Sequence, residues 1–254
     1  LIVHYFSLKM LQNDCYTNNN FFKLYKKFCP GPITFVLKLK KNSKISKNVT
    51  NKKNTLAVRF PKHAKTRKLL KSLIYPLAAP SANISSQISP VSKKDVKDEF
   101  GKKIKFILDG GRSKIGLEST VVNLSGKLKI LRPGAVSPNE ISKILNKRIS
   151  LTKKFKKINS PGLMKKHYSP GIPIKLNCKI PEQNAAFIVF GKNFKKGKNI
   201  FNLSRNGSLN EAAKNLYKTL RNIKNLKYKK INIIKIPNYG LGVAINDRIK
   251  KASN

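Results

Sequence analysis

Small and hydroxyl-bearing side chains are concentrated in residues 77–89, which read Leu-Ala-Ala-Pro-Ser-Ala-Asn-Ile-Ser-Ser-Gln-Ile-Ser. We expect this stretch to open as the end of a buried strand and to pass, at Pro80, into groups that offer hydrogen bonds with little bulk. Because strand side chains alternate between two faces, Ala79 and Ser81 should point the same way. One leaves space and the other presents a hydroxyl, which indicates close approach of a small ligand. A plain Ser- and Asn-rich loop is the alternative.

A second group of polar side chains lies on the predicted strand 55–60. Thr55, Ala57 and Arg59 share one face of it, and the residues between them are apolar. The apolar side can therefore pack while the other side presents a hydroxyl and a guanidinium. A guanidinium is a planar fork that matches a carboxylate or a phosphate. An edge-strand arginine in solvent is the alternative.

Two further features carry chemical interest. His4 follows the apolar run 1–3, where a strand leaves its sheet; a lone histidine is more often structural than ligand-binding. Asp109 precedes two glycines and Arg112, a tight turn whose exposed amides could meet an anion, although such turns are usually only turns.

The elements that must position these residues follow from apolar spacing, turn residues and capping signals. Strands are predicted at 1–3, 33–39, 55–60, 75–79, 106–109, 121–124, 129–131, 185–190 and 231–236. Helices are predicted at 18–28, 64–73, 91–100, 137–146, 208–226 and 241–251. The alternation of strands and helices after residue 173 indicates a small parallel α/β domain.

A polar stretch without periodicity, residues 148–172, separates two domains at 1–147 and 173–254. Its middle, residues 161–170, begins and ends with a Pro-containing turn and holds His167 and Tyr168 side by side. Rigid turns around an ordered motif favour a lid that closes over a cleft and reopens. A passive tether is the alternative.

The chain has 254 residues, 40% of them hydrophobic, which is enough for a core of ordinary size. No apolar run approaches the roughly 18 residues of a membrane span. The three cysteines have no metal or redox spacing, which favours a reducing, cytoplasmic compartment. The formal net charge is +45, yet only eight basic residues are arginine and the lysines are spread throughout, so we favour compositional bias over a shaped nucleic-acid patch.

Several chemistries are disfavoured. There is no Ser-His-Asp or Cys-His arrangement, no nucleophile elbow and no metal-ligand cluster. Residues 191–199 follow a strand but have the wrong glycine spacing for a phosphate loop, with Asn199 in place of Ser or Thr. Gly240 and Gly242 lack the third glycine of a dinucleotide site.

Eight short motifs together resemble the threonylcarbamoyl-AMP synthase family, the YrdC-like domain with a carboxy-terminal extension. In order they are Leu1-Ile-Val-His4, Pro30-Gly-Pro-Ile-Thr34, Leu56-Ala-Val-Arg-Phe-Pro61, Ala79-Pro-Ser-Ala-Asn83, Asp109-Gly-Gly111, Glu118-Ser-Thr-Val-Val122, Arg132-Pro-Gly134 and His167-Tyr168. The resemblance implies a YrdC-like twisted open mixed sheet with helices, plus a small Rossmann-like parallel α/β domain.

The resemblance also implies a reaction. L-threonine, bicarbonate and ATP would form threonylcarbamoyl-AMP with release of pyrophosphate, and a downstream tRNA threonylcarbamoyl transferase would use the product on adenosine 37 of tRNA. By resemblance, threonine would be bound by His4, Arg59, Ala79 and Ser119. ATP would be bound by Thr55, Ser81, Ser89, Arg132 and Tyr168. No residue is assigned as a catalytic acid, base or nucleophile.

Mg²⁺ would accompany ATP through its phosphates, without a dedicated protein cage and without an organic cofactor. The family's basic Lys-x-Arg motif lies just upstream of the strand that begins at Leu1, so we expect an amino-terminally incomplete domain. The alternative function is a double-stranded RNA or tRNA-binding module without catalysis, using the basic surface and no membrane. The sequence lacks the clustered aromatic and basic face that such a module uses.

Overall fold

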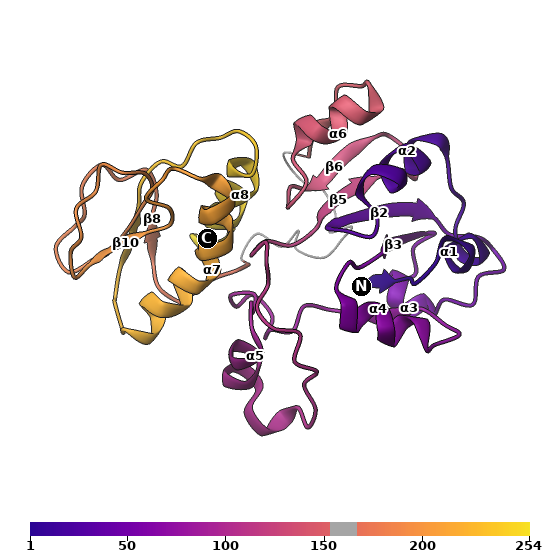
Figure 1. The fold of residues 1–254 in the computed structure, drawn as a ribbon, viewed down its shortest axis with the longest axis horizontal. Helices are drawn as coiled ribbons and strands as arrows, with labels where there is room; N and C mark the ends of the chain where they lie inside the picture. The colour runs from indigo at the N-terminus through magenta and orange to yellow at the C-terminus, as the bar shows by residue number, and fades with distance from the viewer. Residues whose placement is uncertain (153–166) are drawn as a thin grey trace. The chain divides into compact units, whose positions relative to one another are not determined.

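The computed structural model describes residues 1–152 and 167–254, and contacts group them into two compact units (Figure 1). The first unit contains Leu1–Pro80 and the described part of the segment that starts at Glu118. The second contains Ser81–Leu117 and the described part of the segment that ends at Asn254. Residues 81–117 thus group with the carboxy-terminal half, a division that the sequence did not predict. The borders at 147 and 172 stay a prediction, and most of the predicted lid, residues 153–166, lies outside the described residues.

The first unit is built on a mixed sheet. Among the described residues it has seven strands in the order β4-β1-β3-β2-β5-β6-β7. The strands are β1 (Ile2–His4), β2 (Ile33–Lys38), β3 (Thr55–Arg59), β4 (Leu77–Ala79), β5 (Thr120–Asn123), β6 (Lys129–Arg132) and β7 (Ser150–Leu151). Parallel pairs such as β1 with β3 alternate with antiparallel pairs such as β2 with β3. The predicted mixed sheet is confirmed.

Helices of the first unit begin where side chains cap them. They are α1 (Leu8–Asp14), α2 (Asn19–Phe28), the short α3 (Lys47–Thr50), α4 (Ala64–Lys71) and α6 (Pro138–Leu145). The side chain of Asn18 accepts the Phe21 amide at the start of α2. Ser137 and Glu140 form the predicted capping box of α6. Helix α1 was not predicted.

The second unit has a smaller sheet, with four parallel strands among the described residues, in the order β10-β9-β11-β8. They are β8 (Ile174–Lys175), β9 (Ala186–Val189), β10 (Ile200–Asn202) and β11 (Ile231–Ile233). The helices are α5 (Lys93–Phe100), the 3-10 turn η1 (Gly101–Lys103), α7 (Leu209–Asn225) and α8 (Gly242–Ala252). The small parallel α/β domain is therefore confirmed.

Two predictions about local structure are wrong. No strand forms at 106–109, and Phe106 and Leu108 are 81% and 52% exposed. An apolar run becomes a strand only where a neighbouring strand can pair with it, and none does here. The strand before Pro80 is not buried: β4 is an edge strand that ends at Ala79, so strand alternation does not extend to Ser81.

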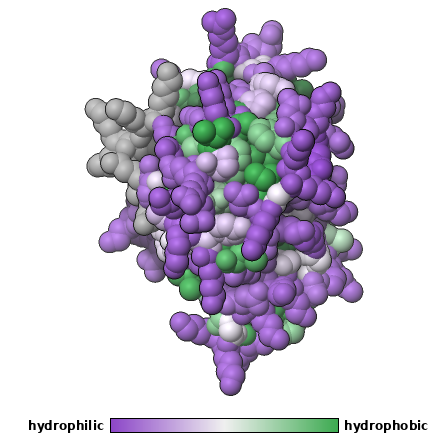
Figure 2. All heavy atoms as spheres, turned by 90° about the vertical axis from the view of Figure 1, so that its left-hand side faces the viewer, coloured by the Kyte–Doolittle hydropathy of each residue, from purple (hydrophilic) through white to green (hydrophobic). Residues whose placement is uncertain are grey.

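The surface is dominated by polar side chains. Figure 2 shows one face of the molecule, where hydrophilic residues surround smaller hydrophobic areas, as the lysine-rich composition leads one to expect. Among the helices of the described ranges, none combines the length and apolar character that a bilayer crossing requires.

Gly134 offers a test of how tightly the first unit is packed. A Cβ placed there would lie 2.4 Å from the Glu118 carbonyl oxygen and 2.6 Å from the Ser119 carbonyl carbon. Overpacking of this kind typically costs about 1–3 kcal/mol. We expect Gly134→Ala to lower the free energy of unfolding by roughly 2 kcal/mol, measured by urea denaturation.

Gly126→Ala is the matched control, because no atom lies within 4 Å of its added Cβ. Equal stability of the two variants would show that Gly134 is not held against the backbone of residues 118–120.

Candidate active site

One row of directly paired residues crosses the larger sheet. His4 on β1 is paired with Arg59 on β3, Arg59 with Thr34 on β2, Thr34 with Val121 on β5, and Val121 with Arg132 on β6. Directly paired residues present their side chains on the same face of a regular sheet. The register shifts beside Val121, and there a hydrogen bond to the Ser119 hydroxyl, which is itself bonded to Thr34, keeps Arg132 on this face. The row therefore gathers an imidazole, two guanidiniums and a hydroxyl across five neighbouring strands.

Alternation along β3 sets which side chains join the row. Leu56 and Val58 are 1% and 0% exposed, so they fix the apolar face of β3 in the core. Arg59 is thereby left on the opposite, partly exposed face, as the sequence predicted. On that same face Ala57 packs with Val36, Val121 and Leu131 in a small apolar cluster beside the polar row.

His4 is held between two strands. It pairs with Arg59 on one side and with Leu77 of β4 on the other, and its ring is hydrogen-bonded to the backbone of Leu77 and Ile2. Burial first, and then the charge of Arg59, lower the pKa of His4 to about 4. Its imidazole is therefore neutral at physiological pH. Ala79 lies on β4, paired with Ile2, two residues along from His4.

Arg59 is a half-buried cation. Burial, followed by the charge of Arg132, lowers the pKa of Arg59 to about 10, with Cys29 and Glu118 acting in the opposite direction. The guanidinium remains charged near neutral pH, and its Nε donates to the Gly31 carbonyl at 3.4 Å. A buried charge is costly unless it is paired, so the neighbourhood of Arg59 and Arg132 favours an anion.

Arg132 fixes Ser119. Its Nε and Nη2 donate to the Ser119 carbonyl oxygen at 3.2 and 2.9 Å, and Nη2 also donates to the Ser119 hydroxyl at 3.2 Å. The hydroxyls of Ser119 and Thr34 share a hydrogen bond of 2.7 Å. All three side chains are buried, so this group is pre-positioned by packing and by charge.

Thr34 is the member of this group that sequence reasoning missed. Its signal was present, because a hydroxyl stands inside the otherwise apolar strand that follows Pro30-Gly-Pro-Ile, and Thr34 is fully buried. A buried hydroxyl needs a partner. That partner, Ser119, is 85 residues away in the sequence, and sequence alone does not reveal it.

The structure divides the predicted ATP residues between the two units. Arg132 and Thr55 belong to the first unit. Thr55 starts β3 and Arg59 ends it, so Thr55 lies roughly 13 Å from Arg59 along the strand, at about 3.3 Å per residue. Ser81, Ser89 and Tyr168 belong to the second unit.

Within the second unit, the segments of Ser89 and Tyr168 are neighbours. Gln87 pairs with Ser169, whose amide donates to the Ser86 carbonyl at 2.9 Å. Ser81 is exposed, whereas Ser89 is buried. The ring of Tyr168 is 1% exposed, stacks on Tyr217 with ring centroids 5.6 Å apart, and has the Arg248 guanidinium 5.0 Å from its centroid. Contact of Tyr168 with ATP stays a prediction.

Comparison with known proteins identifies the family of this chain. A family model described as "Telomere recombination" matches residues 1–134, and a second, described as "Threonylcarbamoyl-AMP synthase, C-terminal domain", matches residues 136–254. The threonylcarbamoyl-AMP synthase of Pyrococcus abyssi is 35% identical over 250 residues, covering 91% of this chain and 72% of the relative. That of Bacillus subtilis is 30% identical over 254 residues, with the same coverage.

A solved structure is similar over the whole chain. The crystal structure of P. abyssi Sua5 complexed with L-threonine has a TM-score of 0.88 and 31% identity, covering 100% of this chain and 79% of that chain. The two family models, the sequence relatives and the solved structure all indicate the same family. The chain belongs to the threonylcarbamoyl-AMP synthase family, enzymes of tRNA threonylcarbamoylation.

Proposed function

We propose that this row across the larger sheet, together with Ser119 beside it, is where this chain makes L-threonylcarbamoyladenylate from L-threonine, bicarbonate and ATP. The observation that carries the proposal is the pair of guanidiniums on one face of the sheet, with Arg132 buried and Arg59 half-buried. Two anionic groups of the substrates, the threonine carboxylate and the ATP triphosphate, match this pair of cations. A relative of similar fold has been solved with L-threonine bound.

Threonine binding follows from the geometry of the row. Arg59 takes the carboxylate, because its guanidinium is charged, half-buried and near a second cation. His4 is neutral and lies next to Arg59 in the register, so it offers a polar contact without adding positive charge. Ser119 contributes its positioned hydroxyl, and Ala79, on the edge strand, contributes backbone groups.

The chemistry has two bond-forming steps. The threonine amine attacks the carbon of bicarbonate, and loss of water leaves N-carboxythreonine. An oxygen of this carbamate then attacks the α-phosphorus of ATP, and pyrophosphate leaves with the electrons of the broken bond. Charge develops on the phosphate oxygens, so fixed cations and donors are what the protein must supply. Arg132 is the cation we assign to the phosphates, and no covalent nucleophile is needed.

The remaining ATP contacts are Thr55 in the first unit and Ser81, Ser89 and Tyr168 in the second. Mg²⁺ would arrive with the nucleotide and neutralise phosphate charge. In the part of the chain that the structure describes, no three His, Cys, Asp or Glu side chains are grouped as metal ligands. We assign the ion to the phosphates of the nucleotide.

The product leaves for a downstream tRNA threonylcarbamoyl transferase. Direct contact with tRNA or other RNA through the lysine-rich surface is a secondary proposal, supported by the charge of +45 and weakened by its even spread. The cytoplasm is the proposed compartment, since Cys15, Cys29 and Cys178 are free thiols.

Arg59→Ala tests the threonine site. The substitution removes a charge-assisted hydrogen-bonding partner, worth about 1.5–3 kcal/mol, so threonine affinity should fall by roughly ten- to a hundredfold. Isothermal titration calorimetry with L-threonine measures this directly. Arg148→Ala is the matched control, because Arg148 belongs to the same unit and is exposed. Unchanged affinity in Arg59→Ala would remove Arg59 from the site.

His4 provides a pH test. The pKa of His4 is about 4 in the folded chain and 6.5 in the unfolded chain. Between pH 4 and pH 6.5, His4 is therefore protonated in the unfolded chain and neutral in the folded chain. His4 therefore lowers stability as pH falls below 6.5, by about 2 kcal/mol at pH 5.

We expect the imidazole resonances of His4 to show no titration between pH 5.5 and 7.5 by NMR. We also expect His4→Gln to lose less stability than wild type between pH 7 and pH 5, measured by denaturant unfolding at both. An inflection near pH 6.5 for His4 would contradict the buried, neutral imidazole.

A further inference from the structure

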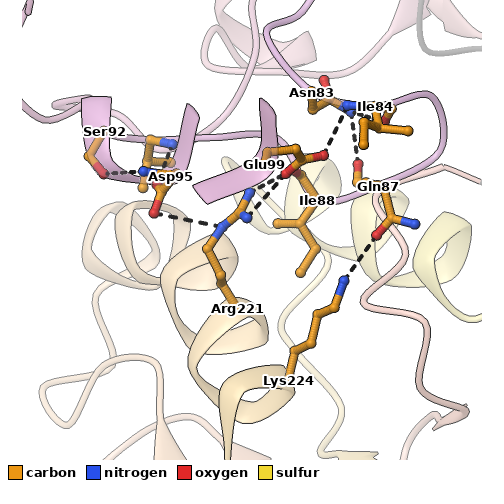
Figure 3. A network of polar contacts seen from close by, with 10 residues as sticks. Asn83, Ile84, Gln87, Ile88, Ser92, Asp95, Glu99, Arg221 and Lys224 are labelled. Carbon is orange, nitrogen blue, oxygen red and sulfur yellow. Dashed lines mark hydrogen bonds and ion pairs between the residues drawn. The ribbon is translucent and has the colours of Figure 1, made fainter. Parts of the chain in front are cut away.

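Arg221, on α7 of the second unit, contacts residues 88–99 of the same unit through all three of its guanidinium nitrogens (Figure 3). Its Nη2 donates to the Ile88 carbonyl oxygen at 2.9 Å. Its Nη1 lies 3.2 Å from Glu99 Oε2, and its Nε lies 3.7 Å from Asp95 Oδ1. The Arg221 and Asp95 side chains are only 17% and 15% exposed, and that of Glu99 is 7% exposed. This is an enclosed ion-pair network instead of a solvated surface pair.

Each carboxylate in the network also holds a backbone amide. The second oxygen of Glu99 accepts the Ile84 amide at 2.9 Å, and the second oxygen of Asp95 accepts the Val91 amide at 2.8 Å. Arg221 therefore fixes residues 84–91, called here the 84–91 loop, at three points. One point is direct, through the Ile88 carbonyl, and two are relayed by the carboxylates.

Neighbouring contacts reinforce the same loop. Lys224, one turn further along α7, reaches the Gln87 side chain at 3.3 Å. Asn83 donates to the carbonyls of Ile84 and Gln87 at 2.8 and 3.1 Å. Ile88 is packed in the core of this unit beside residues of α7. The loop contains Ser89, so the backbone on both sides of a proposed ATP ligand is anchored to α7.

The charges make Arg221 hard to replace. Asp95 and Glu99 stand four residues apart on α5, a spacing at which like charges repel. They are two of only ten acidic residues in a chain with 55 basic ones, so composition does not explain their pairing opposite Arg221. Removing one partner of an enclosed ion-pair network leaves uncompensated charge, and the remaining groups must move toward water.

We propose that Arg221 is a positioning residue for nucleotide binding, which acts by holding the 84–91 loop in the conformation that presents Ser89. The inference rests on the proposed function, because it takes Ser89 to be an ATP ligand. Arg221 itself touches no substrate in this proposal. Threonine is assigned to residues of the first unit, so ATP and threonine affinities should respond differently to its loss.

The test compares Arg221→Ala and Arg221→Lys with Lys218→Ala, which removes an exposed charge from the same helix. Fluorescent-ATP titration and calorimetry with L-threonine give two separate dissociation constants. Hydrogen exchange measures protection of the peptide that covers the 84–91 loop. Protection of α7 in each variant shows that the helix is still folded.

We expect Arg221→Ala to weaken ATP binding about tenfold or more, to change threonine affinity less than twofold, and to speed exchange at Ile84 and Val91. Arg221→Lys keeps the charge but not the planar fork, so its ATP affinity should lie between those of wild type and Arg221→Ala. Lys218→Ala should match wild type in all three measurements.

Three results would overturn the inference. The first is faster exchange of the loop with unchanged ATP affinity, and the second is unchanged exchange in Arg221→Ala. The third is equal weakening of ATP and threonine binding with loss of α7 protection, which would make Arg221 a general stabilising residue. Failure of the wild-type protein to bind ATP would overturn the proposed function as well. If the wild-type protein binds ATP, the first two results overturn only the inference about Arg221.

Discussion

The proposed active site depends on the proximity of two guanidiniums, that of the half-buried Arg59 and that of the buried Arg132. Desolvation and mutual repulsion both disfavour this arrangement, and both lower the pKa of Arg59. A fold tolerates such a cost when hydrogen bonds hold the groups and when a ligand supplies the missing negative charge. Within residues 1–152 and 167–254, Arg132 is held by three hydrogen bonds to Ser119, whereas Arg59 has a single long one to Gly31. Arg59 is thus the cation that most needs an anionic partner.

The mixed sheet explains how such a pair is positioned. Parallel pairing of β1 with β3 places His4 beside Arg59, and parallel pairing of β2 with β5 carries the same row on toward Arg132. Between them stand the linked hydroxyls of Thr34 and Ser119. The opposite face of β3 is packed in the core, which prevents the strand from turning its arginine away. One face of β3 therefore packs in the core, and its other face presents Arg59 to the proposed substrate.

The sequence predicted those features of the fold and the site that depend on residues close together in the chain. The alternation of residues 55–60 predicted the face of Arg59, and Ser137 with Glu140 predicted a helix start. Local patterns failed where pairing decides the outcome. The apolar run 106–109 finds no partner strand and remains exposed. The hydroxyl of Thr34 meets Ser119 only after folding, and Arg221 meets Glu99 across 122 residues of sequence. Such long-range contacts have no signature in one sequence.

The most direct test of the account follows the carbon of bicarbonate. The 254-residue chain is incubated with L-threonine, ATP and ¹³C-labelled bicarbonate, and the nucleotide products are analysed by mass spectrometry. The account predicts threonylcarbamoyl-AMP that carries one labelled carbon, formed together with pyrophosphate, and its loss in Arg59→Ala. Labelled product formed by Arg59→Ala at the wild-type rate would contradict the central role of Arg59. So would pyrophosphate release by wild type without any labelled adenylate.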